Sequence, residues 1–573
     1  MTWLSYALDH ALWGMDPRGY HLTDVLLHAA NAALFCVLAR RLLMLAAPDL
    51  AGGDPLGTWL AAGFAAMLFS IHPLRAESVA WVSARHDVLS GAFYLCSCLC
   101  YLGAHEARVR PRQRLARLLA CGAFFVCALA SWAITVGLFW VFVALDFYPL
   151  RRLPADPRRW LDPGARAVWL EKLPFLLIAL IAGMNTLWGS QASLSIERHG
   201  LPERITLLLY GPAFYVRKTF LPLDLSPLYQ ASANFNDRAV AFSAHGAATL
   251  AATAAFFAAR RRWPGALAAW LCYLAVLAPV TGVLPRGPQL AADRYTYLSC
   301  LPWAALGGWA LLRFRSRATA RGLAAAALLV LGLLTWRQAG VWHDDLSLWR
   351  HALSIDEKSY MAHYNLGTAL LNRGSHASAG AHLRRCMELK PDYVPAYVPL
   401  AAALSKQGRF QEALPLRRRV LSLGTPEARG RAHNDLGGTF SGRETWRGPR
   451  SSIAKPSGCI PGRSWPAITW VLSWRDRAGG SRPWKPMRRR SRWLRENSTP
   501  TGTSLSLWRM AGGRTEPRRS WAASSSCART RPRPTTSWAA CARRRGGPSL
   551  PSSALSGRSR SIRTTATRAT TWA

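Results

Sequence analysis

Charged residues that could carry chemistry gather in three polar segments, which separate long apolar runs. The segments span residues 72–87, 189–239 and 285–295. Carboxylates in these segments could accept a proton, and Arg or Lys side chains could bind an anionic group. The candidate residues are His72, Glu77, Arg85, Asp87, Arg217, Lys218, Asp293 and Arg294.

The position of these residues beside apolar runs makes them candidates. A charged group at the boundary of a membrane span is costly unless it is paired or functional. A structural interpretation stays open for each, because Arg, Trp and Tyr at the membrane interface also anchor helices. For Asp293 beside Arg294, a structural ion pair is favoured over a catalytic base.

The apolar runs are the elements that must position these side chains. Each is rich in Leu, Ala, Val, Phe and Trp and is close to the length that crosses a bilayer as a helix. They predict an all-α, polytopic membrane domain of about ten spans over residues 23–340. The expected spans are 24–39, 57–71, 87–103, 115–131, 133–149, 173–188, 240–258, 263–284, 296–312 and 320–338.

Basic clusters between the runs predict the topology, since Lys and Arg mark cytoplasmic loops. The clusters lie at residues 40–41, 108–117, 151–166, 260–262 and 313–321. Placing them inside leaves residues 1–22, the three polar segments, the corner near Ser131 and everything after about residue 340 outside. The segment 205–221 then cannot cross, so we expect an amphipathic or re-entrant segment at the outer interface.

The formal charge of +42 does not indicate a nucleic-acid partner. Residues 441–573 contribute +24 of it, with 28 Lys and Arg against 4 acidic residues, and much of the remainder lies in the short basic loops. The 12 cysteines show no metal-binding spacing. Cys96, Cys98 and Cys100 alternate within an apolar run and are expected to be buried apolar residues. No metal site is predicted.

After the last run, residues 341–440 follow the 34-residue period of tetratricopeptide repeats. Gly374 and Gly408 are 34 residues apart. Leu366, Ala379 and Leu383 fall at the positions where paired helices of such a repeat pack together. The pattern predicts an α-solenoid, a fold that binds peptides or partner proteins.

From about Ser441 the repeat pattern stops and Arg, Ser, Pro, Trp and Gly dominate. Taken literally, residues 441–573 form an irregular, basic, low-complexity tail. Codons permitted for this stretch, shifted by two nucleotides, spell further tetratricopeptide units at the expected period. We therefore predict that the tail is a frameshifted part of the repeats, and that its tryptophans do not stack on nucleic acid.

With both halves in view, residues 1 to about 440 resemble the family of transmembrane and tetratricopeptide repeat-containing protein O-mannosyltransferases, in its bacterial form. Members are C-type glycosyltransferases with about eleven spans, which take a sugar from a polyprenyl-phosphate carrier on the non-cytoplasmic face. The resemblance rests on the order and spacing of motifs at residues 2–5, 19–23, 72–87, 145–150, 171–174 and 292–297.

The resemblance implies roles for the candidate residues. The carrier phosphate needs cations, for which Arg85, Arg217, Lys218 and Arg294 are candidates. Glu77 and Asp87 would support the site by binding sugar hydroxyls or a divalent ion. The set expected to contact the phosphate or the sugar is completed by His72 and Asp293.

The resemblance also implies partners and a location. The donor is a lipid-linked sugar and the acceptor is a protein or peptide held by the repeats. No cofactor is required with certainty, although a divalent cation is compatible with the site. The expected location is the bacterial inner membrane, with the repeats on the periplasmic side.

The chain departs from the family pattern at two places. The family's catalytic base is an acidic pair in a first external loop, and residues 1–22 match only the remnant of that loop. The base is therefore expected upstream of Met1, and the chain as written is expected to be inactive. At Ser131-Trp132-Ala133 the family commonly has a Lys-Pro pair, so a cationic contact is expected to be missing at that corner.

Two other functions are compatible with the sequence. A membrane scaffold could display the repeats without any enzymatic activity. A transporter or polymerase of lipid-linked glycans is the third possibility, although such transporters usually show internal repetition between their halves, which is not evident here.

Overall fold

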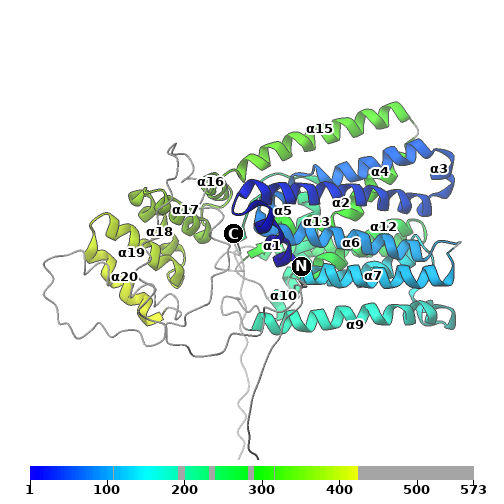
Figure 1. Ribbon diagram of the computed structural model, residues 1–573, viewed down its shortest axis with the longest axis horizontal. Coiled ribbons are helices and arrows are strands. Elements are labelled where there is room, and N and C mark those ends of the chain that lie inside the picture. Colours follow the sequence, from blue (N-terminus) through cyan, green and yellow to red (C-terminus); the bar gives the residue numbers. More distant parts are fainter. Residues whose placement is uncertain (108, 192–200, 231–238, 282–288, 315, 424–573) are drawn as a thin grey trace, which may run out of the picture. The chain divides into compact units, whose positions relative to one another are not determined.

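The computed structural model describes residues 1–107, 109–191, 201–230, 239–281, 289–314 and 316–423. The described part is built of α-helices joined by short 3₁₀ turns, as the apolar runs predict (Figure 1). The tail beyond residue 423, with the third repeat and the expected frameshift, lies outside the described residues. The helices of the first 341 residues are α1 (Thr2–Trp13), α2 (Pro17–Ala46), α3 (Pro48–Gly53), α4 (Pro55–Ser70), α5 (Ala76–Ala80), α6 (Arg85–Ala104), α7 (Pro111–Ser131), α8 (Leu138–Phe147), α9 (Pro163–Gln191), α10 (Leu201–Phe220), α11 (Ala239–Ala258), α12 (Pro264–Leu277), α13 (Thr296–Ser299), α14 (Leu301–Arg313) and α15 (Arg317–Val341).

Six segments of the described residues are long and apolar enough to cross a membrane, and a seventh follows if the bent pair of α4 with residues 73–80 counts as one span. They support the prediction of a multi-pass membrane protein. The other expected spans form shorter helices. Residues 133–147 and 264–280 are apolar but short, and the run 296–312 is divided between α13 and α14.

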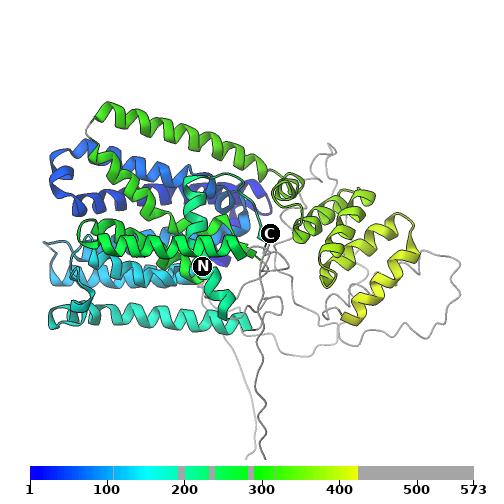
Figure 2. The same cartoon turned by 180° about the vertical axis from the view of Figure 1, so that it is seen from behind.

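The long helices lie side by side in one bundle, which Figure 2 shows from behind. Capping residues fix several of their starts. Asp16 accepts a hydrogen bond from the amide of Arg18, and Asp54 accepts one from the amide of Gly57, each with a proline at the next position. These signals explain why α2 and α4 begin where they do.

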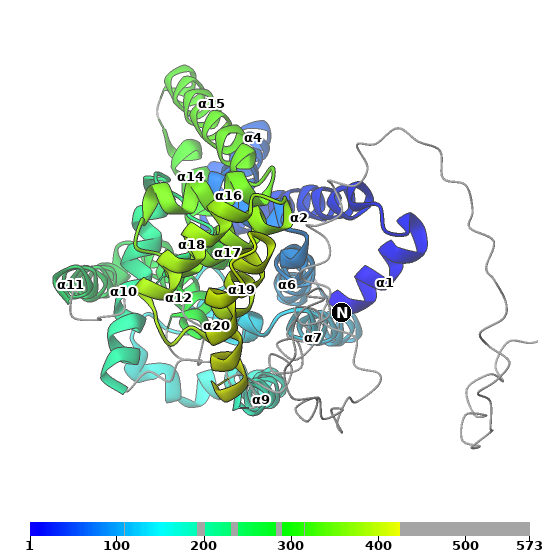
Figure 3. The same cartoon turned by 90° about the vertical axis from the view of Figure 1, so that its left-hand side faces the viewer.

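The edge of the bundle carries apolar side chains outward. In the view of Figure 3, α11 and α15 lie at the periphery of the helices. Large apolar residues of α15 such as Leu329, Leu333 and Trp336 are exposed. An apolar outer surface is what a bilayer would cover.

The polar segments fold into short turns at the ends of the long helices. After α4 the chain bends by 56° and forms η1 (Pro73–Arg75), α5 and η2 (Val82–Ala84) before α6 begins. Two short antiparallel strands, β1 (Tyr229–Gln230) and β2 (Gln289–Ala291), join the other two polar segments and lead into η8 (Asp293–Tyr295). This strand pair was not predicted, because a two-residue strand has no periodic signal.

The residues after α15 form helical hairpins. The pairs α17 with α18 and α19 with α20 pack together, and each pair has a glycine at the same place after its first helix. Gly374 and Gly408 both have a positive φ, of 81° and 77°, which glycine adopts without strain. The bounds are α16 (Asp345–Ile355), α17 (Tyr360–Asn372), α18 (His376–Leu389), α19 (Tyr397–Lys406) and α20 (Phe410–Leu423).

Candidate functional site

The first polar segment is fixed to α10 by His72. The ring Nδ1 accepts a hydrogen bond from the amide of Leu74 at 3.2 Å, so the proton is on Nε2. Nε2 then donates to the carbonyl of Thr219 at 2.9 Å. His72 is therefore a neutral residue that holds two segments together, and its ring nitrogens are both in use.

A buried ion pair joins the first polar segment to the third. Glu77, only 2% exposed, accepts a hydrogen bond from the amide of Arg294 at 2.9 Å and pairs with the Arg294 guanidinium. Arg294 also donates to Gln289 at 2.8 Å and lies over the rings of Trp81 and Tyr295. Because 217 residues separate the partners, only the tertiary fold brings them together.

Asp293 and Lys218 lie in the same region. Asp293 Oδ1 accepts from the Tyr229 hydroxyl at 2.8 Å, and burial raises the pKa of this carboxyl to about 8, with the nearby Glu77 charge adding to the effect. Lys218 Nζ lies over the Tyr229 ring and donates to the carbonyls of Leu223 and Asp224 at 2.6 and 2.8 Å. Burial lowers the pKa of Lys218, against the pull of the Asp293 charge.

Asp87 approaches this group through the first segment. Its Oδ2 accepts from the hydroxyl of Ser78, the neighbour of Glu77, at 2.7 Å. His86 Nε2 lies 3.2 Å from the other carboxylate oxygen. We use the name loop cluster for the charged residues collected here: Arg75, Glu77, Asp87, Lys218, Asp293 and Arg294.

Arg85 was predicted to bind the carrier phosphate, but its guanidinium group is occupied by partners within the protein. Its Nε donates to Asp24 at 2.6 Å, its Nη1 pairs with Asp9, and its Nη2 donates to the carbonyl of Tyr20 at 2.9 Å. Arg85 is fully buried, and each of its guanidinium nitrogens has a partner. The structure therefore places this residue in an ion-paired group with α1 and α2.

Arg217 is the predicted cation with the most open surroundings. It is exposed near the end of α10, where its guanidinium lies 5.8 Å from the centre of the Phe214 ring. Among the described residues no carboxylate forms an ion pair with it. An exposed arginine on an amphipathic helix is accessible to an anionic group at a membrane surface.

Arg75 is a member of the loop cluster that was not selected from the sequence. It is 2% exposed and donates from Nη2 to the Thr296 hydroxyl at 2.8 Å. Its Nε and Nη1 are buried without a hydrogen-bond partner among the described residues. A charge beside a membrane span is costly unless it is paired or functional, and on this ground Arg75 is also a candidate site residue.

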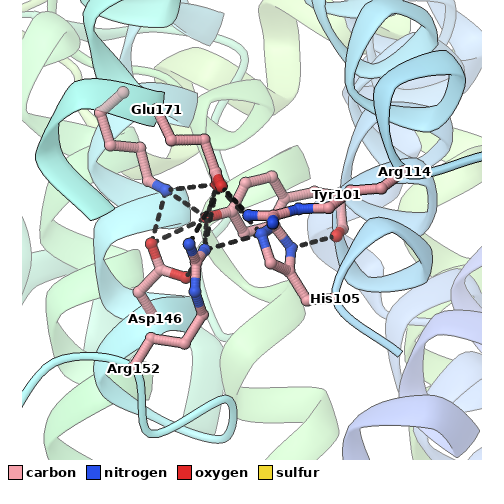
Figure 4. Close-up of polar contacts among 7 residues, drawn as sticks. Tyr101, His105, Arg114, Asp146, Arg152 and Glu171 are labelled. Atoms are coloured by element: carbon pink, nitrogen blue, oxygen red, sulfur yellow. Dashed lines mark hydrogen bonds and ion pairs between the residues drawn. The ribbon is translucent and has the colours of Figure 1, made fainter. Parts of the chain in front are cut away.

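A second cluster lies at the opposite end of α6 (Figure 4). Tyr101 donates to Asp146 at 2.7 Å, and Arg152 bridges Asp146 and Glu171 at 2.9 and 3.0 Å. Lys172 pairs with Asp146 as well. His105 and Arg114 complete this second cluster, in which cations and carboxylates satisfy one another, so it is a structural network.

The described residues contain no group of three or more His, Cys, Asp or Glu side chains placed to hold a metal ion. The carboxylates of the loop cluster are instead held by Arg, Ser and Tyr side chains. A divalent ion therefore has no ready-made site within the described part of the chain. Its involvement stays an expectation from the resemblance.

Comparison with characterised proteins adds independent information. No family model matches the chain. Protein O-mannosyl-transferase Tmtc3 of Drosophila melanogaster is 24% identical over 478 residues, which cover 72% of this chain and 50% of that protein. Protein O-mannosyl-transferase TMTC2 of Mus musculus is 32% identical over 150 residues, covering 26% of this chain and 16% of the mouse protein.

A further relative, Protein O-mannosyl-transferase Tmtc1 of Drosophila melanogaster, is 39% identical over 102 residues, covering 18% of this chain and 10% of that protein. The chain thus spans half the length of Tmtc3 and a smaller share of the other two. The matched proteins are animal proteins, and the bacterial form expected from the motifs stays a prediction. Over part of its length the chain is thus similar to proteins named protein O-mannosyl-transferases.

Proposed function

We propose that the chain is a protein O-glycosyltransferase, which transfers a mannose-like sugar from a polyprenyl-phosphate carrier to Ser or Thr hydroxyls. The observation that carries the proposal is the loop cluster. Buried carboxylates and cations from three distant segments meet at one end of an apolar helical body. That arrangement suits a substrate with a lipid tail and a charged head.

The reaction transfers the sugar to the acceptor oxygen and the hydroxyl proton to a base. The acceptor oxygen attacks the anomeric carbon, the bond from that carbon to the phosphate oxygen breaks, and a carboxylate takes the hydroxyl proton. The phosphate leaves on its carrier with the bonding electrons. We assign Glu77 and Asp87 to holding the sugar, and we propose that the base belongs to the acidic pair that the resemblance places in the first external loop.

The carrier phosphate is assigned to Arg217. The other cations proposed from the sequence have internal partners, namely Asp24 for Arg85, Glu77 for Arg294 and backbone carbonyls for Lys218. Arg217 is exposed and offers a planar guanidinium, which matches a phosphate group in a bidentate manner.

The proposed orientation places the loop cluster outside the cytoplasm. The basic segments 108–117 and 151–166 adjoin the opposite end of α6 and α7, where positive charge favours the cytoplasmic side. Thr335 of α15 donates to the carbonyl of Ile71, the residue before the first polar segment. Helix α16 begins at Asp345, four residues after the end of α15. The helical hairpins, which we interpret as tetratricopeptide repeats, are thereby proposed to lie on the same side and to hold the acceptor.

A non-enzymatic scaffold is the second candidate. Internal pairing of Arg85, Arg294 and Lys218 favours it, because paired cations contribute less to a substrate site. The two functions differ in one outcome, since a scaffold binds polypeptide through its hairpins without transferring sugar.

The test is a transfer assay in liposomes on a protein in which this chain is joined to the first span and acidic external loop of the resembled family, because the chain as written is expected to be inactive. Radiolabelled polyprenyl-phosphate mannose is supplied with Ser/Thr-rich polypeptides, and label in the polypeptide is measured with and without EDTA. We expect label on hydroxyl side chains, and Arg217→Gln should raise the KM for the donor. Polypeptide binding without any label transfer would overturn the proposal in favour of a scaffold. The matched control is Arg159→Gln, which changes an exposed arginine distant in sequence from the loop cluster.

A further inference from the structure

The short segment before residue 231 contacts both the loop cluster and the first helical hairpin. On the cluster side, Tyr229 donates from its hydroxyl to Asp293 at 2.8 Å, and the same hydroxyl accepts from the amide of Ser226 at 3.1 Å. The Tyr229 side chain is therefore held in one orientation by contacts from both sides. It joins this segment directly to a buried carboxylate.

The next residue faces the hairpin. Gln230 Oε1 accepts from the hydroxyl of Ser359 at 2.9 Å and from the amide of Met361 at 3.3 Å. Ser359 is the N-cap of α17, and its own oxygen accepts from the amide of Ala362. The first amides of a helix have no partner within the helix, so the Gln230 side chain completes the cap of α17.

Tyr229 and Gln230 are neighbours in β1, yet one contacts the loop cluster and the other contacts α17. Gln230 lies opposite Gln289 in the β1–β2 ladder, and Gln289 accepts a hydrogen bond from Arg294. Successive side chains of a strand point to opposite faces. The ladder has a register shift between Tyr229 and Gln230; Tyr229 contacts Asp293, and Gln230, which is 6% exposed, contacts α17.

Leu225, in the same segment, supplies a second contact with the helices that follow the bundle. Its carbonyl accepts from His351 Nε2 of α16 at 2.9 Å. It also accepts from Gln338, near the end of α15, at 3.4 Å. The segment therefore bonds α16 through Leu225 and α17 through Gln230, and these two consecutive helices pack on each other.

We infer that Gln230 is a positioning residue that fixes the first helical hairpin relative to the loop cluster. An extended Ser/Thr-bearing polypeptide held by the hairpins is then presented at a constant distance from Asp293 and Glu77. This presentation of the acceptor rests on the proposed function, whereas the attachment of α17 through Gln230 does not.

Hydrogen–deuterium exchange in the full chain, reconstituted in lipid nanodiscs, tests the attachment without any activity. Gln230→Met keeps the side-chain length and removes the acceptor. We expect exchange in residues 359–365 to rise about fivefold to tenfold, as the loss of one or two hydrogen bonds predicts. Gln230→Glu keeps the acceptor oxygen and should restore protection. Gln407→Met serves as the control, because that amide bonds within the hairpins, to His376.

A kinetic measurement tests the presentation of the acceptor. With a long polypeptide, Gln230→Met should raise KM about fivefold or more, and with a short Ser/Thr peptide both KM and kcat should keep their values. Unchanged exchange in Gln230→Met would overturn the inference whatever the activity. If Gln230→Met does not fold, Ser359→Ala, which removes the hydroxyl donor, replaces it. Raised exchange in a protein that transfers no sugar would support the attachment and reject the proposed function.

Discussion

Asp293 shows how burial sets the charge of a single side chain in the loop cluster. It is 3% exposed and receives a hydrogen bond from Tyr229, and its pKa lies at about 8 in the folded protein. Desolvation is the main cause, because a carboxylate loses the water that stabilises its charge. At neutral pH the neutral carboxyl therefore predominates. Among the described residues Arg294 pairs with Glu77, and not with Asp293 as the sequence suggested.

The free energy of unfolding should decrease as the pH rises, because Asp293 must then lose its proton. Its folded pKa is raised above the unfolded value, so the folded state binds more protons between about pH 4 and pH 8 and loses this stability as the pH rises through that window. Asp293→Asn mimics the neutral form and should flatten the dependence. We expect the melting temperature of the wild type, measured in detergent, to drop by at least about 2 °C more than that of the variant between pH 6 and pH 9. Equal slopes would contradict the assignment.

Individual residues could be predicted as charged groups at span ends, but their partners could not. The structure brings together Glu77, Arg294 and Asp293 as one group, although the sequence gives no pairing between segments so far apart. Arg85 shows that a charged residue at the end of a span can be structural and need not belong to a substrate site. Its cost of burial is offset by Asp9 and Asp24, a pairing that depends on how α1 folds against α2 and α6.

At the scale of helices, the second cluster holds α6, α8 and α9 together. Lys172→Met should destabilise the protein by about 3–5 kcal/mol, since it leaves the buried carboxylate of Asp146 without one of its cations. Thermal unfolding in detergent measures the loss. Arg159→Ala removes an exposed pair and should cost less than about 1 kcal/mol. The double variant with Asp146→Leu should recover part of the loss, and equal effects of the two single variants would refute a structural role.

Gly367 permits the close packing of the first hairpin. A Cβ atom there would meet the Leu383 side chain at 2.7 Å, which no folded protein tolerates without movement. Gly367→Val should therefore destabilise α17 against α18 by about 1–3 kcal/mol. Gly380→Ala is the matched control, because its Cβ meets only the flexible end of Gln407 at 3.4 Å. Proteolysis of the hairpins at increasing temperature would detect the difference, and equal resistance of the two variants would exclude a packing constraint.

The helices themselves were predictable from apolar runs, and their interruptions were not. The 34-residue spacing of Gly374 and Gly408 correctly marks equivalent positions of two hairpins. In contrast, the run 296–312 was predicted as one span on its apolar character, although Pro302 near the start of α14 is a signal for its division at Cys300 into α13 and α14. Hydropathy reports how apolar a stretch is, whereas breaks depend on local turns such as the one that begins at Asp293.

For the whole molecule, the central feature is an apolar helical body with charged loops at one end and a paired structural cluster at the other. The loop cluster depends on contacts between segments more than 200 residues apart. The similarity to proteins named protein O-mannosyl-transferases agrees with the proposed role in sugar transfer. The proposed function therefore requires that the loop cluster supports that reaction.

The most direct measurement is sugar transfer by Glu77→Gln in the liposome assay. We predict a loss of about 100-fold or more in kcat/KM, because the substitution removes a buried charge that organises the site. The melting temperature should fall because Arg294 loses its buried carboxylate, and a cooperative unfolding transition would show that the variant is folded. The double variant with Arg294→Gln removes both charges and should fold while staying inactive. Transfer by a folded Glu77→Gln protein at the rate of the Arg159→Gln control would contradict the account.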